Sequence, residues 1–337
     1  MMINKTSKSC LLIVPTSFYS YSEHLKQALT LKNYNVVIAN HEYPENTFGK
    51  IMGKLGIPLL LRMTKKKIIK KFIKNKSYDL VIIVKGRGMS TQLIEQLKRV
   101  STKVVSYTFD SFKYHPAPLR WYKQVDNFYT FDYRDAQKHD LQIIELFSSM
   151  PESSSAKKIN YQISAIVRNH SDRLKYISSV LNAISEKEAF IYIYEQNIIL
   201  FLQNFIKNPF LYIRFWKYIS FKSLPYEDYI RILRESNFTI DFAHPSQTGI
   251  TIRCFEALSS QTKIITNNSH VRHYKYFNSD NTILFDPSSR PDSLLEHFER
   301  IRNIIPETHH RTINHFVDQL IELDKKQELE PVKFRSC

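Results

Sequence analysis

The chain has 337 residues, and its hydrophobic content of 43% is ordinary for a globular protein and sufficient for two sizeable cores. Its three cysteines, Cys10, Cys254 and Cys337, lie far apart, which excludes a disulfide framework and a cysteine metal site and indicates reduced thiols in the cytoplasm. The net charge of +16 indicates an anionic partner, which could be nucleic acid, an anionic membrane face or a phosphorylated substrate.

Apolar strands alternate with helical patterns along the first half of the chain. The run 10–14 is too short for a signal peptide or a membrane span, so no targeting segment is expected. The alternation predicts a parallel sheet with helices on both faces. The predicted strands are 11–16, 35–41, 79–88, 103–110 and 127–133, and the predicted helices are 20–31 and 91–99.

The alternation restarts after a stretch, 148–158, that has the composition of a linker between domains. Pro225 is expected at the first position of a helix. The predicted strands are 159–169, 189–195, 238–242, 263–266 and 282–286, and the predicted helices are 172–185, 225–236, 292–304 and 308–325.

These elements predict an α/β protein with two Rossmann-like domains whose parallel sheets face a cleft. The predicted boundaries give a first domain at 1–150, a linker at 151–158, a second domain at 159–308 and a C-terminal helix with a tail at 309–337. Strand ends and helix starts facing a cleft suit a ligand that contains a nucleotide, together with a second substrate.

One stretch, 241–268, has a distinctive order of elements: a buried strand, a polar loop, a helix with apolar residues at helical spacing, and a second strand. The segment HPSQTGITIRCFEAL, followed by KIITNN, resembles the C-terminal domain of bacterial GT-B glycosyltransferases, particularly the group-1-like enzymes of lipopolysaccharide core and capsule assembly. The resemblance covers the layout of most of the chain, but it is specific only over about residues 238–286.

The resemblance implies that the first domain lies on the acceptor side and that the second binds the nucleotide sugar, and it implies roles for residues of the second domain. Glu256 matches the acidic residue that contacts the donor, commonly its ribose hydroxyls, and arginines would stabilise the charge of the departing phosphate. Backbone amide groups at a helix start are a ready site for an anion. The residues implied in donor binding are Arg168, Arg173, Thr248, Gly249, Thr251, Arg253 and Glu256.

Each of these roles has a structural alternative. Glu256 stands on a helix that otherwise reads as buried, and it could form an ion pair with Arg253 instead of binding a ligand. Many retaining members of the family carry a glutamate eight residues before the second one, where this chain has Thr248. The stereochemical outcome, retaining or inverting, therefore stays open.

Further candidates stand at predicted strand ends. Asp110 ends a strand, as a catalytic base facing a cleft would, although aspartate is also common in helix caps and turns. His244 is a second catalytic candidate, because it precedes Pro245 at another strand end. Lys85 and Arg87 flank a glycine where acceptor or phosphate contact is plausible, but the motif lacks the glycines of a dinucleotide or phosphate-binding loop.

The segment 62–76 contains eight basic residues and no acidic ones, and its apolar residues fall on one helical face. A basic amphipathic helix lies naturally on an anionic membrane, so surface contact is expected through Lys66, Lys67, Lys70 and Lys71. The alternative is a helix packed on its own domain with a solvated basic face.

Together these features predict a glycosyltransferase that moves a sugar from a nucleotide-activated donor to a lipopolysaccharide or other lipid-linked glycan. The enzyme would lie in the cytoplasm on the inner face of the membrane. No metal or other cofactor is expected, because the chain contains no Asp-x-Asp pair to hold a divalent cation. The alternatives are a sugar-nucleotide-binding protein without catalysis and a basic nucleic-acid-binding protein, but no recognition motif for nucleic acid is present.

Overall fold

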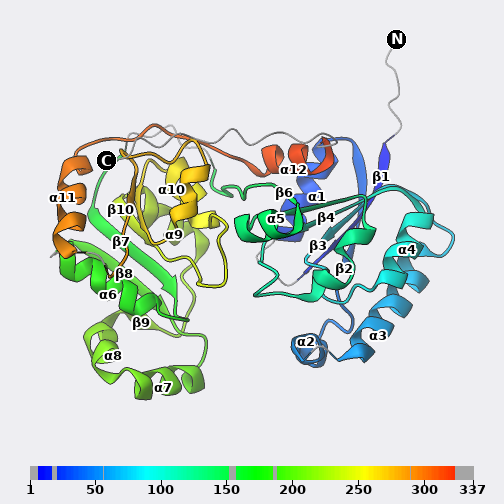
Figure 1. The fold of residues 1–337 in the computed structure, drawn as a ribbon, viewed down its shortest axis with the longest axis horizontal. Coiled ribbons are helices and arrows are strands. Elements are labelled where there is room, and N and C mark those ends of the chain that lie inside the picture. The colour runs from blue at the N-terminus through cyan, green and yellow to red at the C-terminus, as the bar shows by residue number, and fades with distance from the viewer. Residues whose placement is uncertain are drawn as a thin grey trace, which may run out of the picture. The chain divides into compact units, whose positions relative to one another are not determined.

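The computed structural model describes residues 7–16, 21–55, 57–151, 157–184, 188–288 and 290–322. They form two compact units, each with its own six-stranded parallel sheet (Figure 1). Unit 1 comprises the described residues of Met1–Leu146, Ser246–Gly249 and Thr312–Glu328, and unit 2 comprises those of Phe147–Pro245 and Ile250–Arg311. The two Rossmann-like sheets confirm the predicted fold class.

The sheet of unit 1 has the strand order β2-β1-β3-β4-β5-β6, and every neighbouring pair is parallel. Its strands are β1 (Lys8–Val14), β2 (Tyr34–Asn40), β3 (Tyr78–Val84), β4 (Ser101–Thr108), β5 (Asn127–Thr130) and β6 (Gln142–Ile143). Its longer helices are α1 (Tyr21–Leu31), α2 (Thr47–Lys54), α3 (Pro58–Ile68), α4 (Thr91–Arg99), α5 (Tyr133–His139) and α12 (Ile313–Glu322).

The helix α12 belongs to unit 1 although the chain reaches it only after all of unit 2. Its residues Phe316, Val317 and Leu320 are fully buried. The Phe316 ring packs edge-on against Tyr107 of β4, with ring centroids 4.8 Å apart. Lys32, just beyond α1, forms an ion pair with Asp318 at 2.5 Å. The last described helix is therefore part of the core of the first unit.

The sheet of unit 2 has the order β12-β11-β10-β7-β8-β9, again with parallel neighbours only. Its strands are β7 (Tyr161–Arg168), β8 (Ala189–Tyr194), β9 (Ile219–Ser220), β10 (Ser236–Asp241), β11 (Lys263–Thr266) and β12 (Thr282–Leu284). Its α-helices are α6 (Arg173–Ile184), α7 (Ile198–Lys207), α8 (Pro209–Phe215), α9 (Tyr226–Arg234), α10 (Ile252–Ser259) and α11 (Pro291–Ile301).

Both sheets have a point at which the direction of the strand order reverses. In unit 2, β7 has β8 on one side and β10 on the other, so the loops after β7 and β10 lead away in opposite directions. In unit 1 the same reversal occurs between β1 and β3. Ligands of open α/β sheets bind beside such points, at the carboxyl ends of the strands. The carboxyl ends of β7 and β10 therefore mark the first place to look for a site in unit 2.

Several predicted boundaries are wrong in detail. The predicted strand 79–88 is too long, because Lys85 and Gly86 take left-handed backbone angles, φ 64° and 59°, and turn the chain after Val84. Pro225 is the residue before α9 rather than its first residue. The helix predicted at 308–325 begins only at Ile313, and its predicted end lies outside the described residues.

Two features differ from the expected pattern more substantially. The sequence predicts no helix between β8 and β9, where the structure has α7 and α8. The basic segment 62–76 is α-helical only to Ile68 and continues as a π-helical turn, Ile69–Ile73. In the part of the chain that the structure describes, no helix is both long enough and apolar enough to cross a bilayer.

Candidate functional site

Two arginines stand at the carboxyl edge of the unit 2 sheet, where β7 ends and α6 begins. Arg168 is the last residue of β7, and Arg173 is the first residue of α6. The Nη1 of Arg173 donates to the Arg168 carbonyl at 3.0 Å, which holds the turn between them closed. Arg168 itself donates through Nη2 to the side-chain oxygen of Gln196, just beyond β8. The local contacts thus fix both guanidinium groups beside the reversal point of the sheet.

On the other side of the reversal point, Asp241 ties the end of β10 to the start of α10. Its buried carboxylate accepts hydrogen bonds from the Thr251 hydroxyl at 2.8 Å and from the Thr266 hydroxyl at 3.3 Å. Thr251 is the N-cap residue of α10, but its side chain does not cap the helix, because its hydroxyl binds Asp241 instead. The Thr251 hydroxyl therefore has a structural partner, and the first-turn amides of α10 receive no side-chain cap from it.

Several of the predicted basic residues lie around His170, in the turn between β7 and α6. Its ring lies 5.8 Å from the ring of His244, which follows β10. Burial and neighbouring positive charges lower the pKa of His170 to about 3, so the imidazole is neutral at pH 7. The charges that act on it, in decreasing order, are those of Arg173, His244, Arg168 and Arg253.

The structure therefore brings four residues predicted from the sequence to one place in unit 2. We call Arg168, Arg173, Arg253, His244 and the added His170 the basic cluster. Burial is the largest cause of the lowered pKa of His170, and the neighbouring positive charges add to it. Three guanidinium groups gathered in one place suit an anion. His170 could not be chosen from the sequence alone, because its position beside His244 depends on the pairing of β7 with β10.

Glu256 lies in α10 and is buried, and tyrosines from α9 occupy both of its carboxylate oxygens. The Tyr226 hydroxyl donates to Oε1 at 2.9 Å, and the Tyr229 hydroxyl donates to Oε2 at 2.7 Å. Burial raises the pKa of Glu256, while the two tyrosine hydrogen bonds and the charge of Arg253 oppose that shift. Among the described residues, no ion pair joins Glu256 to Arg253 within 4.0 Å. The carboxylate thus connects α9 to α10, and its implied contact with a donor stays a prediction.

Thr248 and Gly249 belong to unit 1 by their contacts, although they follow β10 in the chain. The Thr248 amide donates to the Asp132 carboxylate at 2.6 Å, and the Thr248 hydroxyl accepts from the Arg134 amide at 3.0 Å. A Cβ at Gly249 would come within 2.2 Å of the Phe131 ring, so this position requires glycine. Both residues fit tightly against the turn between β5 and α5.

At the carboxyl edge of unit 1, Asp110 is held by two donors. The Lys85 ammonium lies 2.7 Å from Asp110 Oδ2, and the Gln247 side-chain amide donates to Oδ1 at 3.2 Å. The same ammonium lies 4.7 Å from the centre of the Phe109 ring. The predicted base and one of the two predicted acceptor contacts therefore form a single ion pair, with both side chains largely shielded from solvent.

Arg87, the other predicted acceptor contact, pairs with residues that the sequence did not indicate. Its Nε lies 3.2 Å from the carboxylate of the buried Glu42, and His41 Nε2 lies 3.8 Å from the same carboxylate group. Burial and the charges of Arg87 and Lys85 keep the pKa of His41 well below its usual range. His115 is in a similar environment, and burial is the main cause that lowers its pKa to about 4. His41 and Glu42 follow β2 and His115 follows β4, so these residues come near Arg87 only in the folded chain.

The predicted membrane residues lie on the surface of unit 1. Lys66, Lys67, Lys70 and Lys71 are all exposed on α3 and the π-helical turn after it. The apolar face of this segment is not exposed, because Ile68, Phe72 and Ile73 are buried in the core of unit 1. The segment therefore presents a basic face and packs its apolar face on its own unit.

No protein-family model matches this sequence, and no relative is found among curated proteins. Solved structures do resemble it over nearly their whole length. The lipopolysaccharide outer core galactosyltransferase WaaB has a TM-score of 0.57 at 10% identity, with 94% of this chain and 96% of that one covered. HepE from Anabaena, in complex with UDP-glucose, has a TM-score of 0.56 at 8% identity, with coverage of 93% and 95%. A UDP-GlcNAc 2-epimerase from Methanocaldococcus jannaschii has a TM-score of 0.51 at 12% identity, with coverage of 93% and 99%.

The chain has the GT-B fold. Identities of 8–12% show this fold and nothing finer. Fold alone does not fix an activity, because one fold hosts several chemistries. The chemistry of the protein therefore depends on the residues at the carboxyl ends of the strands in the two sheets.

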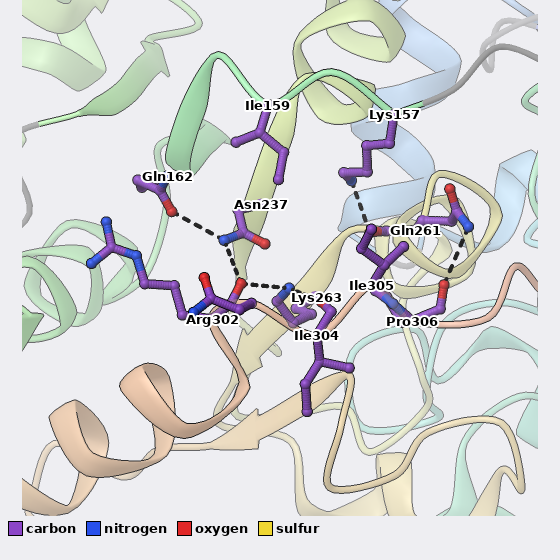
Figure 2. A pocket seen from close by; sticks show the side chains of 11 residues that line it. Lys157, Ile159, Gln162, Asn237, Gln261, Lys263, Arg302, Ile304, Ile305 and Pro306 are labelled. Carbon is purple, nitrogen blue, oxygen red and sulfur yellow. Dashed lines mark hydrogen bonds between the residues drawn. The ribbon is translucent and has the colours of Figure 1, made fainter.

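Unit 2 has a cavity of about 270 Å³ at the amino ends of its strands, opposite the carboxyl ends where the basic cluster lies (Figure 2). Lys157 and Lys263 line it, and burial lowers their pKa values to about 7 and about 8. Lys157 Nζ donates to the carbonyls of Ser260 and Gln261 just after α10, and Lys263 Nζ donates to the carbonyl of Ile304 just after α11. Both ammonium groups satisfy backbone carbonyls beyond helix ends. We therefore assign this cavity a structural role.

Within the ranges that the structure describes, no group of three or more His, Cys, Asp or Glu side chains is placed to hold a metal ion. Cys10 and Cys254 are buried free thiols. The positive charge at the carboxyl edge of unit 2 comes from the basic cluster.

Proposed function

We propose that this protein is a glycosyltransferase that moves a sugar from a nucleotide-activated donor to a lipid-linked surface glycan such as lipopolysaccharide. The observation that carries this proposal is the basic cluster. Three arginines, from the end of β7 and the first turns of α6 and α10, gather with two histidines at the reversal point of the unit 2 sheet. Transfer of the sugar breaks its bond to a phosphate oxygen, and the departing phosphate needs positive charge beside it.

Arg168 and Arg253 would bind the departing diphosphate or monophosphate. A guanidinium can donate two parallel hydrogen bonds to phosphate oxygens, and the start of α10 adds backbone amides. The uncapped first turn of α10 supports this arrangement, because the Thr251 hydroxyl is bound to Asp241. With this much fixed positive charge, we propose that the reaction needs no metal ion.

Unit 1 would supply the groups that handle the acceptor. Asp110 would accept the proton of the attacking acceptor hydroxyl, and Lys85 would hold the carboxylate in position through their 2.7 Å contact. If the reaction retains the anomeric configuration, this base is not required. Arg87 would contact an anionic part of the acceptor, with Glu42 and His41 orienting it.

Calorimetric titration tests the donor site directly. We expect one nucleotide sugar from a panel of uridine, guanosine, adenosine, cytidine and thymidine derivatives to bind with a Kd in the micromolar range, and the matching free nucleotide to compete with it. Arg168→Ala should weaken that binding by about tenfold or more, because a charge-assisted hydrogen bond to phosphate is lost.

The control for this titration is Arg300→Ala, which removes an exposed arginine from the last turn of α11. It should leave the affinity unchanged. Absence of binding by every nucleotide sugar would contradict the proposal. Binding without transfer to any lipid-linked glycan would instead favour a sugar-nucleotide-binding protein without catalysis. Binding of nucleic acid that survives moderate salt would favour a nucleic-acid-binding protein.

A lipid-linked acceptor would place the enzyme at the inner face of the cytoplasmic membrane. We propose that unit 1 contacts this membrane through the basic face of α3 and the π-helical turn after it. Reversing the charge of Lys66, Lys67, Lys70 and Lys71 to glutamate should weaken binding to vesicles that contain phosphatidylglycerol by at least about 100-fold. Each basic residue near such a surface contributes about 1 kcal/mol, and the four reversals also add repulsion.

Sedimentation with vesicles measures this effect, and vesicles of pure phosphatidylcholine provide the neutral control. Because the apolar residues of this segment are buried, its share of the binding should fall steeply as salt is added. If the charge reversal leaves vesicle binding intact, the basic face of α3 is only a solvated surface.

A further inference from the structure

The helices α7 and α8 display an unusual number of exposed apolar side chains. The two helices lie next to each other at the β9 end of unit 2, in the lower part of that unit in Figure 1. Nine of the 23 exposed large hydrophobic residues in the described part of the chain fall between β8 and α9. They are Ile198, Ile199, Leu200, Leu202, Ile206, Phe210, Ile213, Trp216 and Phe221, and we call them the α7–α8 surface.

Four of the five exposed apolar residues of α7 share one side of the helix, and Leu200 is the exception. Ile198, Ile199, Leu202 and Ile206 fall within roughly 100° of its circumference at 3.6 residues per turn. Ile206 is 78% exposed, and Phe210 at the start of α8 is 87% exposed. Soluble proteins rarely leave a continuous stripe of this kind in water without a use for it.

The opposite sides of both helices are anchored, so the exposed stripe is not the result of poor packing. Phe201 of α7 and Tyr212 and Phe215 of α8 are buried in the core of unit 2. Asn197 caps α7 by accepting from the Leu200 amide at 2.9 Å. The two helices are therefore held in place, and unit 2 presents their outer sides as a preformed surface.

The charge around this surface has one sign. Between Glu195 and Glu227 the chain has no acidic residue, and it has four basic ones, Lys207, Arg214, Lys217 and Lys222, all of which are exposed. Exposed Trp216 and Phe221 stand among these basic side chains. Apolar and aromatic side chains surrounded by lysine and arginine are the features of a segment that lies in a membrane interface.

We propose that the α7–α8 surface docks unit 2 onto an anionic lipid bilayer, with its apolar side chains inserted at the level of the lipid head groups. A second copy of the same chain is a poorer partner, because it would bring four like charges against four. The surface is distinct from the basic face of α3 and does not depend on the transferase activity. Its apolar residues are exposed, whereas Ile68, Phe72 and Ile73, which belong to the segment with the basic face, are buried.

Tryptophan fluorescence reports on this surface directly. The chain contains two tryptophans, and Trp121 is fully buried in unit 1, whereas Trp216 is 61% exposed. Vesicles of equimolar phosphatidylcholine and phosphatidylglycerol should shift the emission of the full-length protein to shorter wavelength, and lipids brominated on their acyl chains should quench it. Trp216→Phe should abolish both responses, leaving the constant signal of Trp121.

The decisive variant replaces Ile206, Phe210 and Ile213 together by serine. These side chains are exposed, so folding should be unaffected, but vesicle binding should weaken by at least about 100-fold because the inserted apolar area is lost. The matched control replaces three exposed apolar residues elsewhere in unit 2, Ile159, Leu295 and Ile305, by serine, and it should bind vesicles like the wild type.

Three results would overturn the proposal. The first is an unchanged Trp216 emission in the presence of anionic vesicles. The second is an equal loss of vesicle binding in the control variant. The third is a wild-type dimer that the decisive variant converts to a monomer, without any response to vesicles, since this would show that the surface pairs two copies of the chain.

Discussion

Replacing Arg253 by lysine is expected to lower kcat for sugar transfer by about 100-fold, with little change in the KM for the acceptor. Lysine keeps the positive charge but cannot reproduce the planar pair of hydrogen bonds that a guanidinium makes to phosphate. The charge on the leaving phosphate grows as the sugar departs, so the loss should appear in the catalytic rate rather than in binding.

Arg168→Lys should behave similarly, because the charges of Arg168, at the end of β7, and Arg253, in the first turn of α10, both act on His170. Arg300→Lys, on the exposed end of α11, is the matched control and should keep full activity. Steady-state kinetics with donor and acceptor varied separately would measure the effect. Full turnover by both cluster variants would refute their role at the leaving group.

Replacing Glu256 by alanine should lower the free energy of unfolding by about 3 kcal/mol, because it leaves two tyrosine hydroxyls without their acceptor. One of them, from Tyr229, is only partly accessible and lies between α9 and α10. Urea denaturation would measure the loss. Glu227→Ala, at an exposed position of α9, should change stability by less than about 0.5 kcal/mol.

The glutamine variant separates the hydrogen bonds of Glu256 from its charge. Burial raises the pKa of the carboxyl in the folded protein, so the folded state binds more protons than the unfolded state between the ordinary pKa of 4.5 and the raised pKa. The contribution of Glu256 to stability therefore falls as the pH rises through that window and is constant above it. Glu256→Gln should remove this pH dependence, and an identical pH profile of the two proteins would contradict the raised pKa.

Most strands of both sheets could be predicted because a parallel strand buried on both faces is a short continuous apolar run. Runs such as LLIV in β1 and VIIV in β3 are of this kind, and their residues are almost fully buried. The ends of the elements were less predictable. The left-handed turn at Lys85 and Gly86 leaves no hydrophobic signal, so the predicted strand continues past it.

The helices α7 and α8 were not predicted, and here the cause is an excess of apolar residues. Their segment is apolar at most positions, so few polar residues mark the side that faces solvent. Only the structure separates the buried side, which includes Phe201 and Tyr212, from the exposed side, which includes Ile206 and Phe210.

The arginines of the candidate site were predictable because they stand near predicted strand ends, and Arg253 also lies in the segment that resembles a known family. Their companions were not, since His170 and the tyrosine partners of Glu256 come from parts of the chain without a motif of their own. A single sequence also gives no sign that Thr248 and Gly249 fit against Phe131 and Asp132. Such contacts depend on the tertiary fold rather than on local pattern.

The return of the chain to unit 1 through α12 has a consequence for how the protein is made. A ribosome that has finished Leu146 must still add about 170 residues before α12 begins, which takes roughly 10 to 30 s. During that interval the sites on β4 and α1 that receive Phe316 and Asp318 stay uncovered on the nascent chain. Unit 2 is translated as one nearly continuous stretch and can complete its core first. Folding of the nascent polypeptide therefore does not follow the order of synthesis, and a fragment that stops at Leu146 would leave the apolar surface around Tyr107 open to aggregation.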